Sequence, residues 1–197
     1  MICVDIEATG IDPRTHSILS IGAVDTEHPS RQFYEECRIW DGAHISDEAL
    51  AVCGFTREEC VDPTKKTEGE AVQLFLAWAW EIEGDRTLAG QNVSFDRDYL
   101  QFASARAGLD WDLAHRTIDT HTLAVMHMVK SGLVPPVANH RSAMNLDAIL
   151  QYCGIPEEPS PHNALTGALS HAEVISRLLY GRKLLPEFQQ FEIPWRK

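Results

Sequence analysis

The chain has 197 residues, of which 44% are hydrophobic, and a formal net charge of −12. This length supports one substantial core, so we expect a single domain over residues 1–185 and a C-terminal tail over residues 186–197. Long apolar runs and a signal-peptide pattern are both absent from the sequence, so we expect a cytoplasmic protein that does not enter the membrane. The acidic balance argues against wrapping of long duplexes, because that mode of binding depends on basic surfaces.

The first part of the chain predicts three strands and then a helix. Segments 1–6, 18–25 and 32–39 have strand-like patterns, and turn-forming residues separate them, so we expect an antiparallel meander. Thr67 and Glu70 form a capping-box pattern that predicts the start of the helix. Apolar residues follow at helical spacing: Val72, Leu74, Phe75, Trp78 and Ile82.

The rest of the chain alternates between strand and helix patterns. A strand is expected over residues 86–90 and helices over 95–107, 145–152 and 163–179. Residues 118–123 are ambiguous, with a helix after them that ends near Val129, and residues 130–143 predict an irregular loop. The order of elements predicts an α/β fold with a mixed central sheet of about five strands flanked by helices.

Two carboxylates stand two residues apart in the first predicted strand. Asp5 and Glu7 lie in the run CVDIEATG, and side chains at this spacing share one face of a strand. Like charges held close together are relieved by a bound cation or by a raised pKa. Oxygen ligands favour magnesium or manganese. A strand end whose acids face solvent is the alternative for this pattern taken by itself.

Two later segments carry further candidate chemistry. Asp96 lies at the start of a predicted helix in GQNVSFDRDYL, where it could reach toward Asp5 and Glu7. His162 precedes the last predicted helix in PHNAL, where a loop histidine is free to point into a cleft. A histidine with a purely structural role is the alternative at that position.

Together these segments resemble the DEDD family of 3′–5′ exonucleases in its histidine-containing subclass (DEDDh), similar to the proofreading subunit of bacterial DNA polymerase III. The first motif, D-x-E-x-T-G, matches residues 5–10, and the second, N-x-x-F-D, matches residues 92–96. The third, H-x-A-L-x-D, matches residues 162–165, but Gly167 stands where its final aspartate is expected. The resemblance covers most of the chain and implies a ribonuclease H-like exonuclease fold.

The resemblance also implies a reaction and its residues. It implies metal-dependent hydrolysis at the 3′ end of single-stranded DNA or RNA, with two Mg²⁺ or Mn²⁺ ions clamping the reacting phosphate. Asp5, Glu7 and Asp96 would be the metal ligands, and His162 would accept a proton from the attacking water. The implied substrate-binding positions are Ala8, Thr9 and Asn92. The expected partner is a nucleic-acid 3′ end, and a homodimer or a protein partner stays open.

Gly167 leaves several interpretations open, because glycine cannot ligate a metal. The chain is a weak or manganese-dependent nuclease that uses water or His171 in place of the missing acid, a degenerate relative that binds 3′ ends or a protein without cutting, or a chain with an introduced substitution. His171 lies four residues beyond Gly167 on the same helical face, where packing is its alternative role. The leading hypothesis is the exonuclease, and its rival is the binding or adaptor protein. DNA and RNA substrates are not distinguished, because the 2′-hydroxyl contact is local.

Overall fold

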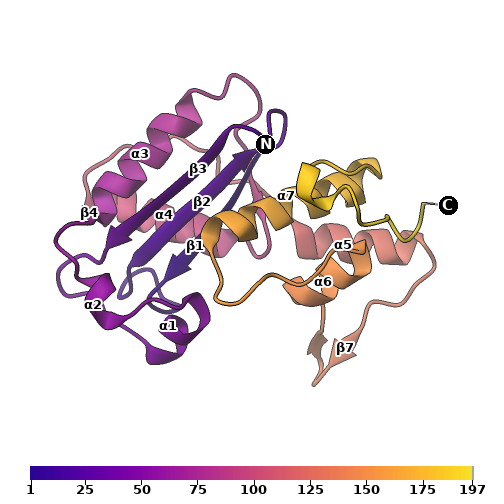
Figure 1. Ribbon diagram of the computed structural model, residues 1–197, viewed down its shortest axis with the longest axis horizontal. Coiled ribbons are helices and arrows are strands. Elements are labelled where there is room, and N and C mark those ends of the chain that lie inside the picture. The colour runs from indigo at the N-terminus through magenta and orange to yellow at the C-terminus, as the bar shows by residue number, and fades with distance from the viewer. Residues whose placement is uncertain (197) are drawn as a thin grey trace.

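A six-stranded mixed sheet lies at the centre of the computed structural model, which describes residues 1–196 (Figure 1). Lys197, which ends the expected tail, lies outside the described residues. The strand order is β4-β3-β2-β1-β5-β6. The strands are β1 (Ile2–Ala8), β2 (Ile18–Asp25), β3 (Gln32–Arg38), β4 (Lys66–Thr67), β5 (Leu88–Gly90) and β6 (Thr117–Asp119). The predicted antiparallel meander of β1, β2 and β3 is confirmed, and β5 and β6 continue the sheet in parallel.

The helices cover both faces of this sheet. They are α1 (Asp47–Cys53), α2 (Arg57–Cys60), α3 (Glu68–Trp80), α4 (Ser94–Arg106), α5 (Thr120–Lys130), α6 (Leu146–Cys153) and α7 (Ala164–Tyr180), with a 3₁₀ turn η1 (Pro186–Phe188). Helices α3 and α4 pack on one face, and α7 crosses β1 and β2 on the other (Figure 1). The α/β prediction is therefore confirmed, with a sixth strand, the two-residue β4, that we did not expect.

The alternation of β1 sorts its side chains between the two faces. Ile2, Val4 and Ile6 are buried in the main core with α3 and α4. Cys3 points to the opposite face, where it packs with Ala172 of α7. A strand covered on both faces reads as a nearly continuous apolar run, so the two acids of β1 stand out against their surroundings.

Local capping explains where the main helices begin. Thr67 and Glu70 form the predicted capping box at α3, in which the Thr67 hydroxyl accepts from the Glu70 amide at 3.2 Å and Glu70 accepts from the Thr67 amide at 2.7 Å. Asn163 caps α7 by accepting from the Leu165 amide at 3.0 Å. Helix α7 ends at Gly181, which has a positive φ of 61°.

The segment over residues 130–143 differs from the irregular loop that we expected. It contains a short hairpin, β7 (Val137–Ala138) and β8 (Arg141–Ser142), which projects from the body of the molecule (Figure 1). Asn139 and His140 both have positive φ, which is the geometry of a tight two-residue hairpin turn. The turn consists of Asn and His and lacks the glycine that usually marks such a hairpin. The sequence pattern therefore did not predict it.

The C-terminal segment packs against α7 through one buried cation. Arg177 is fully buried and pairs with Glu173 at 2.7 Å. Its guanidinium also donates to the carbonyl oxygens of Phe188 at 3.1 Å and Phe191 at 3.0 Å. Residues beyond the expected boundary at 185 thus supply partners to a buried charge of the main helix. Within residues 1–196, none of the helices combines the length and hydropathy that a membrane crossing requires.

Candidate active site

Two acids of β1 lie at its carboxyl end and face α7. Asp5 and Glu7 share the face of Cys3, because side chains alternate along the strand. Asp5 is half-buried and Glu7 is only 8% exposed. The pairing with β2 shifts register between Glu7 and Ala8, and such irregularities turn a strand and re-aim its side chains.

A third acid reaches the same place from the opposite layer. Asp96 lies in the first turn of α4 and is 3% exposed. Its Oδ1 accepts a hydrogen bond from the backbone N–H of Ile6 at 3.0 Å. Strand β5 pairs with β1 only at Ile2 and Cys3, so the Ile6 amide has no hydrogen-bond partner on β5. The Asp96 carboxylate accepts this hydrogen bond instead. The helix that follows β5 therefore fixes Asp96 against the strand that carries the other two acids.

The turn after β1 is held by hydrogen bonds that involve the rest of the first motif. Thr9 is fully buried, and its hydroxyl donates to the His44 carbonyl at 2.7 Å and accepts from the Ser17 amide at 2.9 Å. Its own amide donates to the Ser17 carbonyl at 2.9 Å. The hydroxyl of Tyr99 donates to the Gly10 carbonyl at 2.6 Å. The Thr-Gly pair is thus used inside the protein, and it fixes the direction in which the chain leaves the site.

The two remaining positions with expected roles lie at the rim of this region. His162 is partly exposed, immediately before the Asn163 cap of α7, and its backbone N–H donates to the Val52 carbonyl at 3.1 Å. Asn92 is exposed and has a positive φ of 50°, in the turn between β5 and α4. Ala8 is half-buried at the last position of β1. Within residues 1–196, the imidazole of His162 makes no hydrogen bond.

Helix α7 approaches the acids so closely at Gly167 that a side chain there would require the Asp5 side chain to move. A Cβ atom built on Gly167 would collide with Asp5 Oδ2 and would lie 2.8 Å from its Cγ. The aspartate side chain thus occupies the space that a residue other than glycine would need at position 167. Gly167 therefore packs against Asp5. The sequence indicated only that this glycine removes a metal ligand.

Burial and mutual repulsion raise the pKa values of all three carboxyl groups. Burial raises the pKa of Glu7 to about 7, with a further contribution from the charge of Glu158. The pKa of Asp5 is raised well above its usual value by burial and then by Asp96, Glu7 and Glu158. Burial also raises the pKa of Asp96, against the hydrogen bond from Ile6. The site is therefore a concentration of negative charge that lacks a compensating cation.

A fourth acid, Glu158, adds negative charge that acts on Asp5 and Glu7, although its sequence context gave no sign of this. It lies in the loop between α6 and α7, and its Oε1 is 2.8 Å from the Thr166 hydroxyl. Neither the motifs nor the periodicity of the chain marks this glutamate. Only the path of the loop brings it to the acids of β1.

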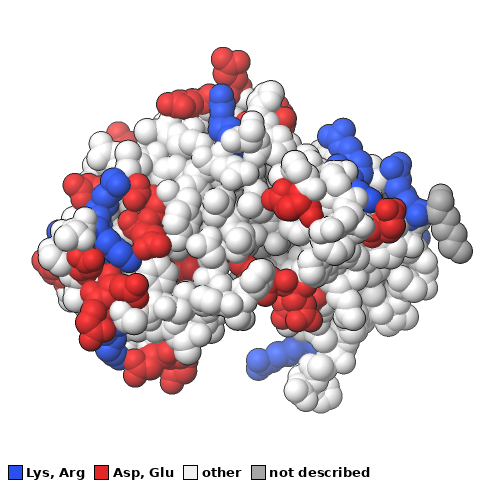
Figure 2. All heavy atoms as spheres, in the orientation of Figure 1, with Lys and Arg blue, Asp and Glu red and all other residues white. Residues whose placement is uncertain are grey.

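The site opens toward solvent at one edge of the molecule. The space-filling view shows a notch at the lower edge, between the part that carries α1 and α2 and the projecting hairpin (Figure 2). Acidic side chains lie on its wall above the hairpin, and a basic side chain lies on the hairpin side of the notch. The start of α7 and the carboxyl end of β1 lie above this notch (Figure 1). A chain end could approach the carboxylates from this side.

The profile of the Exonuclease family (RNase_T) matches residues 2–175. The chain belongs to this exonuclease family. The match spans all three motifs, so the family resemblance seen in the sequence is confirmed.

Among curated proteins, the exonuclease chain is 30% identical over 126 residues to a PolC-type DNA polymerase III of Thermotoga maritima. The match covers 62% of the chain and 8% of that polymerase. The chain is 29% identical over 134 residues to an oligoribonuclease of Vibrio vulnificus, which covers 62% of the chain and 72% of that enzyme.

Solved structures share the fold of this exonuclease chain. The nuclease domain of 3′hExo, described as a DEDDh family member bound to rAMP, has a TM-score of 0.70 at 18% identity and covers 93% of each chain. Exonuclease I of E. coli in complex with a dA16 oligonucleotide has a TM-score of 0.69 at 17% identity, covering 92% of this chain and 40% of that one. The same enzyme has also been solved with single-stranded DNA in a zinc-bound form. That structure has a TM-score of 0.67 at 17% identity, and the match covers 92% of this chain and 41% of that one.

The donor atoms of the exonuclease site fit a hard divalent ion in kind. The carboxylate oxygens of Asp5 and Glu7 accept no hydrogen bond from residues 1–196, and no described lysine or arginine pairs with either. Unpaired buried carboxylates are costly, and oxygen donors of this type suit Mg²⁺ or Mn²⁺. No three described His, Cys, Asp or Glu side chains within residues 1–196 already converge into a closed metal site. Convergence on an ion therefore needs rotation of these side chains from their present positions.

His171 does not stand in for the missing acid of the third motif. It is 1% exposed, and its Nδ1 lies beside Gly90 and the Val4 carbonyl, inside the layer between α7 and the sheet. Burial lowers its pKa to about 4, so the imidazole is neutral at physiological pH. Of the two roles left open for His171, the structure favours packing.

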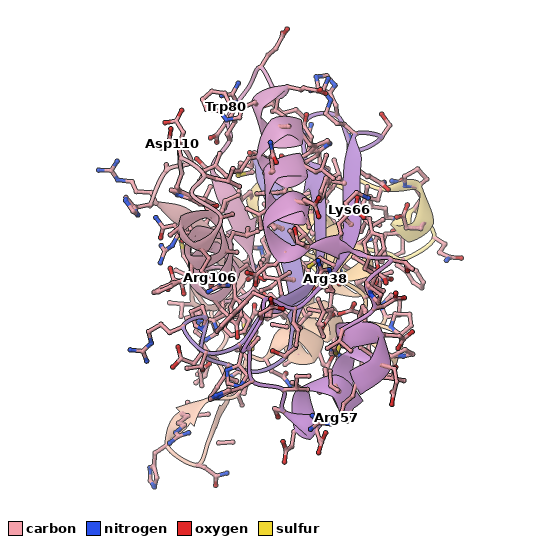
Figure 3. The ribbon with its side chains drawn as sticks, turned by 90° about the vertical axis from the view of Figure 1, so that its left-hand side faces the viewer. Arg38, Arg57, Lys66, Trp80, Arg106 and Asp110 are labelled. Atoms are coloured by element: carbon pink, nitrogen blue, oxygen red, sulfur yellow. The ribbon has the colours of Figure 1, made fainter. Side chains whose placement is uncertain are left out.

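One group of basic side chains lies on the face that carries α3. Figure 3 shows Arg38, Arg57, Lys66 and Arg106 on the side of the molecule where α3 is in front. Three of them form ion pairs: Arg57–Asp47 at 2.6 Å, Lys66–Glu35 at 2.9 Å and Arg106–Glu68 at 2.7 Å. This face presents paired charges, which makes it a poor surface for phosphate groups.

Proposed function

We propose that this exonuclease domain hydrolyses phosphodiester bonds at the 3′ end of single-stranded DNA or RNA, with divalent ions held by Asp5, Glu7 and Asp96. The observation that carries the proposal is that Asp5 and Glu7 lie on one face at the carboxyl end of β1, and that Asp96 of α4 accepts a hydrogen bond from Ile6 of the same strand. Membership of the exonuclease family supports the reaction class.

Each residue contributes a separate physical task. By its likeness to the exonuclease family, Asp5 would be shared between the ions, and Glu7 and Asp96 would complete the ligand set. Bound divalent ions would supply positive charge that favours ionisation of an attacking water and stabilises charge on the phosphate. His162 would accept the proton from that water, since a histidine side chain can act as a general base and this one lies at the open rim.

The proposed contacts with the substrate are limited to the end of a nucleic-acid chain. Ala8 and Asn92 lie at the rim and would contact the terminal nucleotide, with Asn92 presenting an exposed amide. Thr9 would act indirectly, because its hydroxyl and amide are already bonded to His44 and Ser17. A site that holds only a few phosphates is compatible with a net charge of −12, because bound divalent ions reverse the local field.

The proposal is tested by replacing one ligand while its structural hydrogen bond is kept. Asp96→Asn retains an oxygen that can accept from Ile6 but removes the charge. We expect nucleotide release from 5′-labelled single-stranded DNA and RNA, with Mg²⁺ or Mn²⁺, to fall by at least about 100-fold. Asp98→Asn is the matched control, because Asp98 lies two residues away and pairs with Arg97 at 2.6 Å, and it should keep the wild-type rate.

Two results would contradict this proposal. Equal activity of the Asp96→Asn and Asp98→Asn proteins would show that this carboxylate is not a ligand in the reaction. Tight binding of a 3′ end in calorimetry, with no nucleotide released by wild-type protein, would instead support the rival function of a binding or adaptor protein.

A further inference from the structure

We infer that the hairpin of β7 and β8 is an arm that binds the single-stranded substrate upstream of its 3′ end, with Arg141 contacting a phosphate group. The inference rests on the proposed function, because it concerns how the same site holds its substrate. The hairpin lies between the second and third sequence motifs and belongs to neither of them.

Hydrogen bonds fix the base of the arm beside the turn that carries Asn92. The side chain of Gln91, which directly precedes Asn92, donates to the carbonyl of Met144 at 3.5 Å. Met144 follows β8 by two residues and is 3% exposed. The backbone N–H of Ala143 donates to the carbonyl of Pro136 at 3.0 Å and joins the two sides of the hairpin at its base. The arm therefore has a defined position next to one of the proposed substrate-binding residues.

Strand alternation directs Arg141 away from the neighbouring helix. The Oγ atom of Ser142 lies 2.8 Å from His121 Nε2, so the Ser142 side chain faces α5. Neighbouring residues of a strand point to opposite faces, so Arg141 points away from α5. Its partner across the hairpin is Ala138, whose methyl group is too small to cover it. The guanidinium is thus left exposed on the arm.

Arg141 carries a positive charge that the protein does not use internally. Its guanidinium has no ion-pair or hydrogen-bond partner within residues 1–196, whereas three of the basic side chains on the α3 face are paired. It is the only lysine or arginine among residues 131–176. Figure 2 shows a basic side chain on the hairpin side of the notch, below the acidic wall. A polyanion in the notch is repelled by that wall and attracted by a cation on the arm.

Exposed apolar side chains on the same arm suit the bases of a single strand. Val134 is 88% exposed and Val137 is 70% exposed. A single strand presents unpaired bases together with its phosphates, so it matches a surface that combines apolar side chains with a cation. A protein partner would explain the apolar side chains and leave the unpaired cation beside the notch unexplained.

The test compares substrates that can and cannot reach the arm. The long substrate is a strand of about 15 nucleotides, as DNA and as RNA, which is at the upper end of the length that single-strand sites cover. The short substrate is a dinucleotide without a terminal phosphate. Its one phosphate is the group to be hydrolysed, so none is left for the arm. The measurements are kcat and KM over a range of salt concentrations, and fluorescence anisotropy of the labelled long strand.

Arg141→Gln removes the charge from the arm, and Arg116→Gln is the matched control. Arg116 is also an exposed arginine whose side chain has no ion-pair or hydrogen-bond partner within residues 1–196. It directly precedes β6, which runs in the same direction as β5 and β1. Arg116 therefore lies at the end of the sheet opposite to the acids, where a substrate in the notch does not reach it.

We expect Arg141→Gln to raise KM for the long strand about fivefold or more, with little change in kcat. The slope of log KM against log salt should fall by roughly 0.7, the contribution of one phosphate contact with a single strand. KM for the dinucleotide should stay at the wild-type value, as should both substrates with Arg116→Gln. Arg141→Lys should recover most of the affinity for the long strand, because lysine also binds phosphate as a point charge.

The failures of the two proposals are distinguishable. Equal KM values of Arg141→Gln and Arg116→Gln for the long strand would overturn the arm and leave the proposed function intact. A KM that rises equally for the dinucleotide and the long strand would also overturn the arm, because the change would then act on the whole site. A long strand that wild type binds through Arg141 in anisotropy, but does not shorten, would support the arm and contradict the proposed function.

Discussion

Glu7 links the chemistry of the site to the stability of the protein. Its pKa in the folded state is about 7, above the value of 4.5 for an unperturbed glutamate, so the fold favours its protonated form. The stability that this provides is fully present below pH 4.5 and is lost as the pH rises through 7. The shift corresponds to roughly 3 kcal/mol of unfolding free energy, which bound divalent ions would restore at neutral pH.

We predict that Glu7→Gln stabilises the metal-free protein in a pH-dependent way. The gain over wild type should be small at pH 5 and approach roughly 3 kcal/mol at pH 8, because glutamine mimics the neutral acid. Urea unfolding in EDTA at the two pH values measures the difference. His171, whose lowered pKa of about 4 makes stability fall from pH 6.5 toward 4, is present in both proteins and cancels. A gain of equal size at both pH values would refute the raised pKa of Glu7.

The sequence identified some of these residues and could not identify others. Asp5 and Glu7 were found because strand alternation forces residues two apart onto one face, and Asp96 because it begins a helix after a neighbouring strand. Glu158 was missed because its position depends on the path of an irregular loop. The contact between Gly167 and Asp5 was also invisible, since it depends on the spacing between a helix and a sheet.

At the scale of elements, the packing of α7 on β2 fixes the geometry of the site. Gly22 is paired with Asp5 across the sheet, and a Cβ on Gly22 would overlap the backbone of Ala164 and Leu165. The first turn of α7 therefore rests directly on the strand next to β1, which carries Asp5 and Glu7. Any residue larger than glycine must push the helix start away from Asp5.

We predict that Gly22→Ala lowers stability and weakens ion binding together. Overpacking of this kind typically costs about 1 to 3 kcal/mol, and backbone atoms cannot rotate away as side chains do. Urea unfolding and Mn²⁺ titration are the measurements. Ser20→Ala, two residues along the same strand, is the control and should not displace α7, because it removes an atom where Gly22→Ala adds one. A Gly22→Ala protein with wild-type stability and Mn²⁺ affinity would show that this close contact does not position α7.

The elements with strong periodic or capping signals were predicted well. Helix α3 begins at its capping box and α7 at its Asn163 cap, within a residue of expectation. Helices α1 and α2 were not predicted, because seven and four residues are too few for a clear apolar period. The two-residue strand β4 was missed because it exists only through pairing with β3.

At the scale of the whole molecule, negative charge is concentrated where a negatively charged substrate is expected. The protein carries a net charge of −12, and acidic side chains are spread over the face shown in Figure 2 as well as around the notch. An enzyme of this composition depends on divalent ions to bring a phosphate close to its carboxylates. The chain also corresponds to only 8% of the PolC-type polymerase that it matches, so the comparison reaches no further than one part of that protein.

The most direct measurement is the degradation pattern of 5′-labelled single-stranded DNA and RNA by the wild-type protein, with Mg²⁺, with Mn²⁺ and with EDTA. We predict a ladder of labelled products that shortens by one nucleotide at a time from the 3′ end, appears with a divalent ion and is abolished by EDTA. Labelled strands that stay at full length with every ion, while the protein binds them, would contradict a catalytic role for the carboxylates at the end of β1.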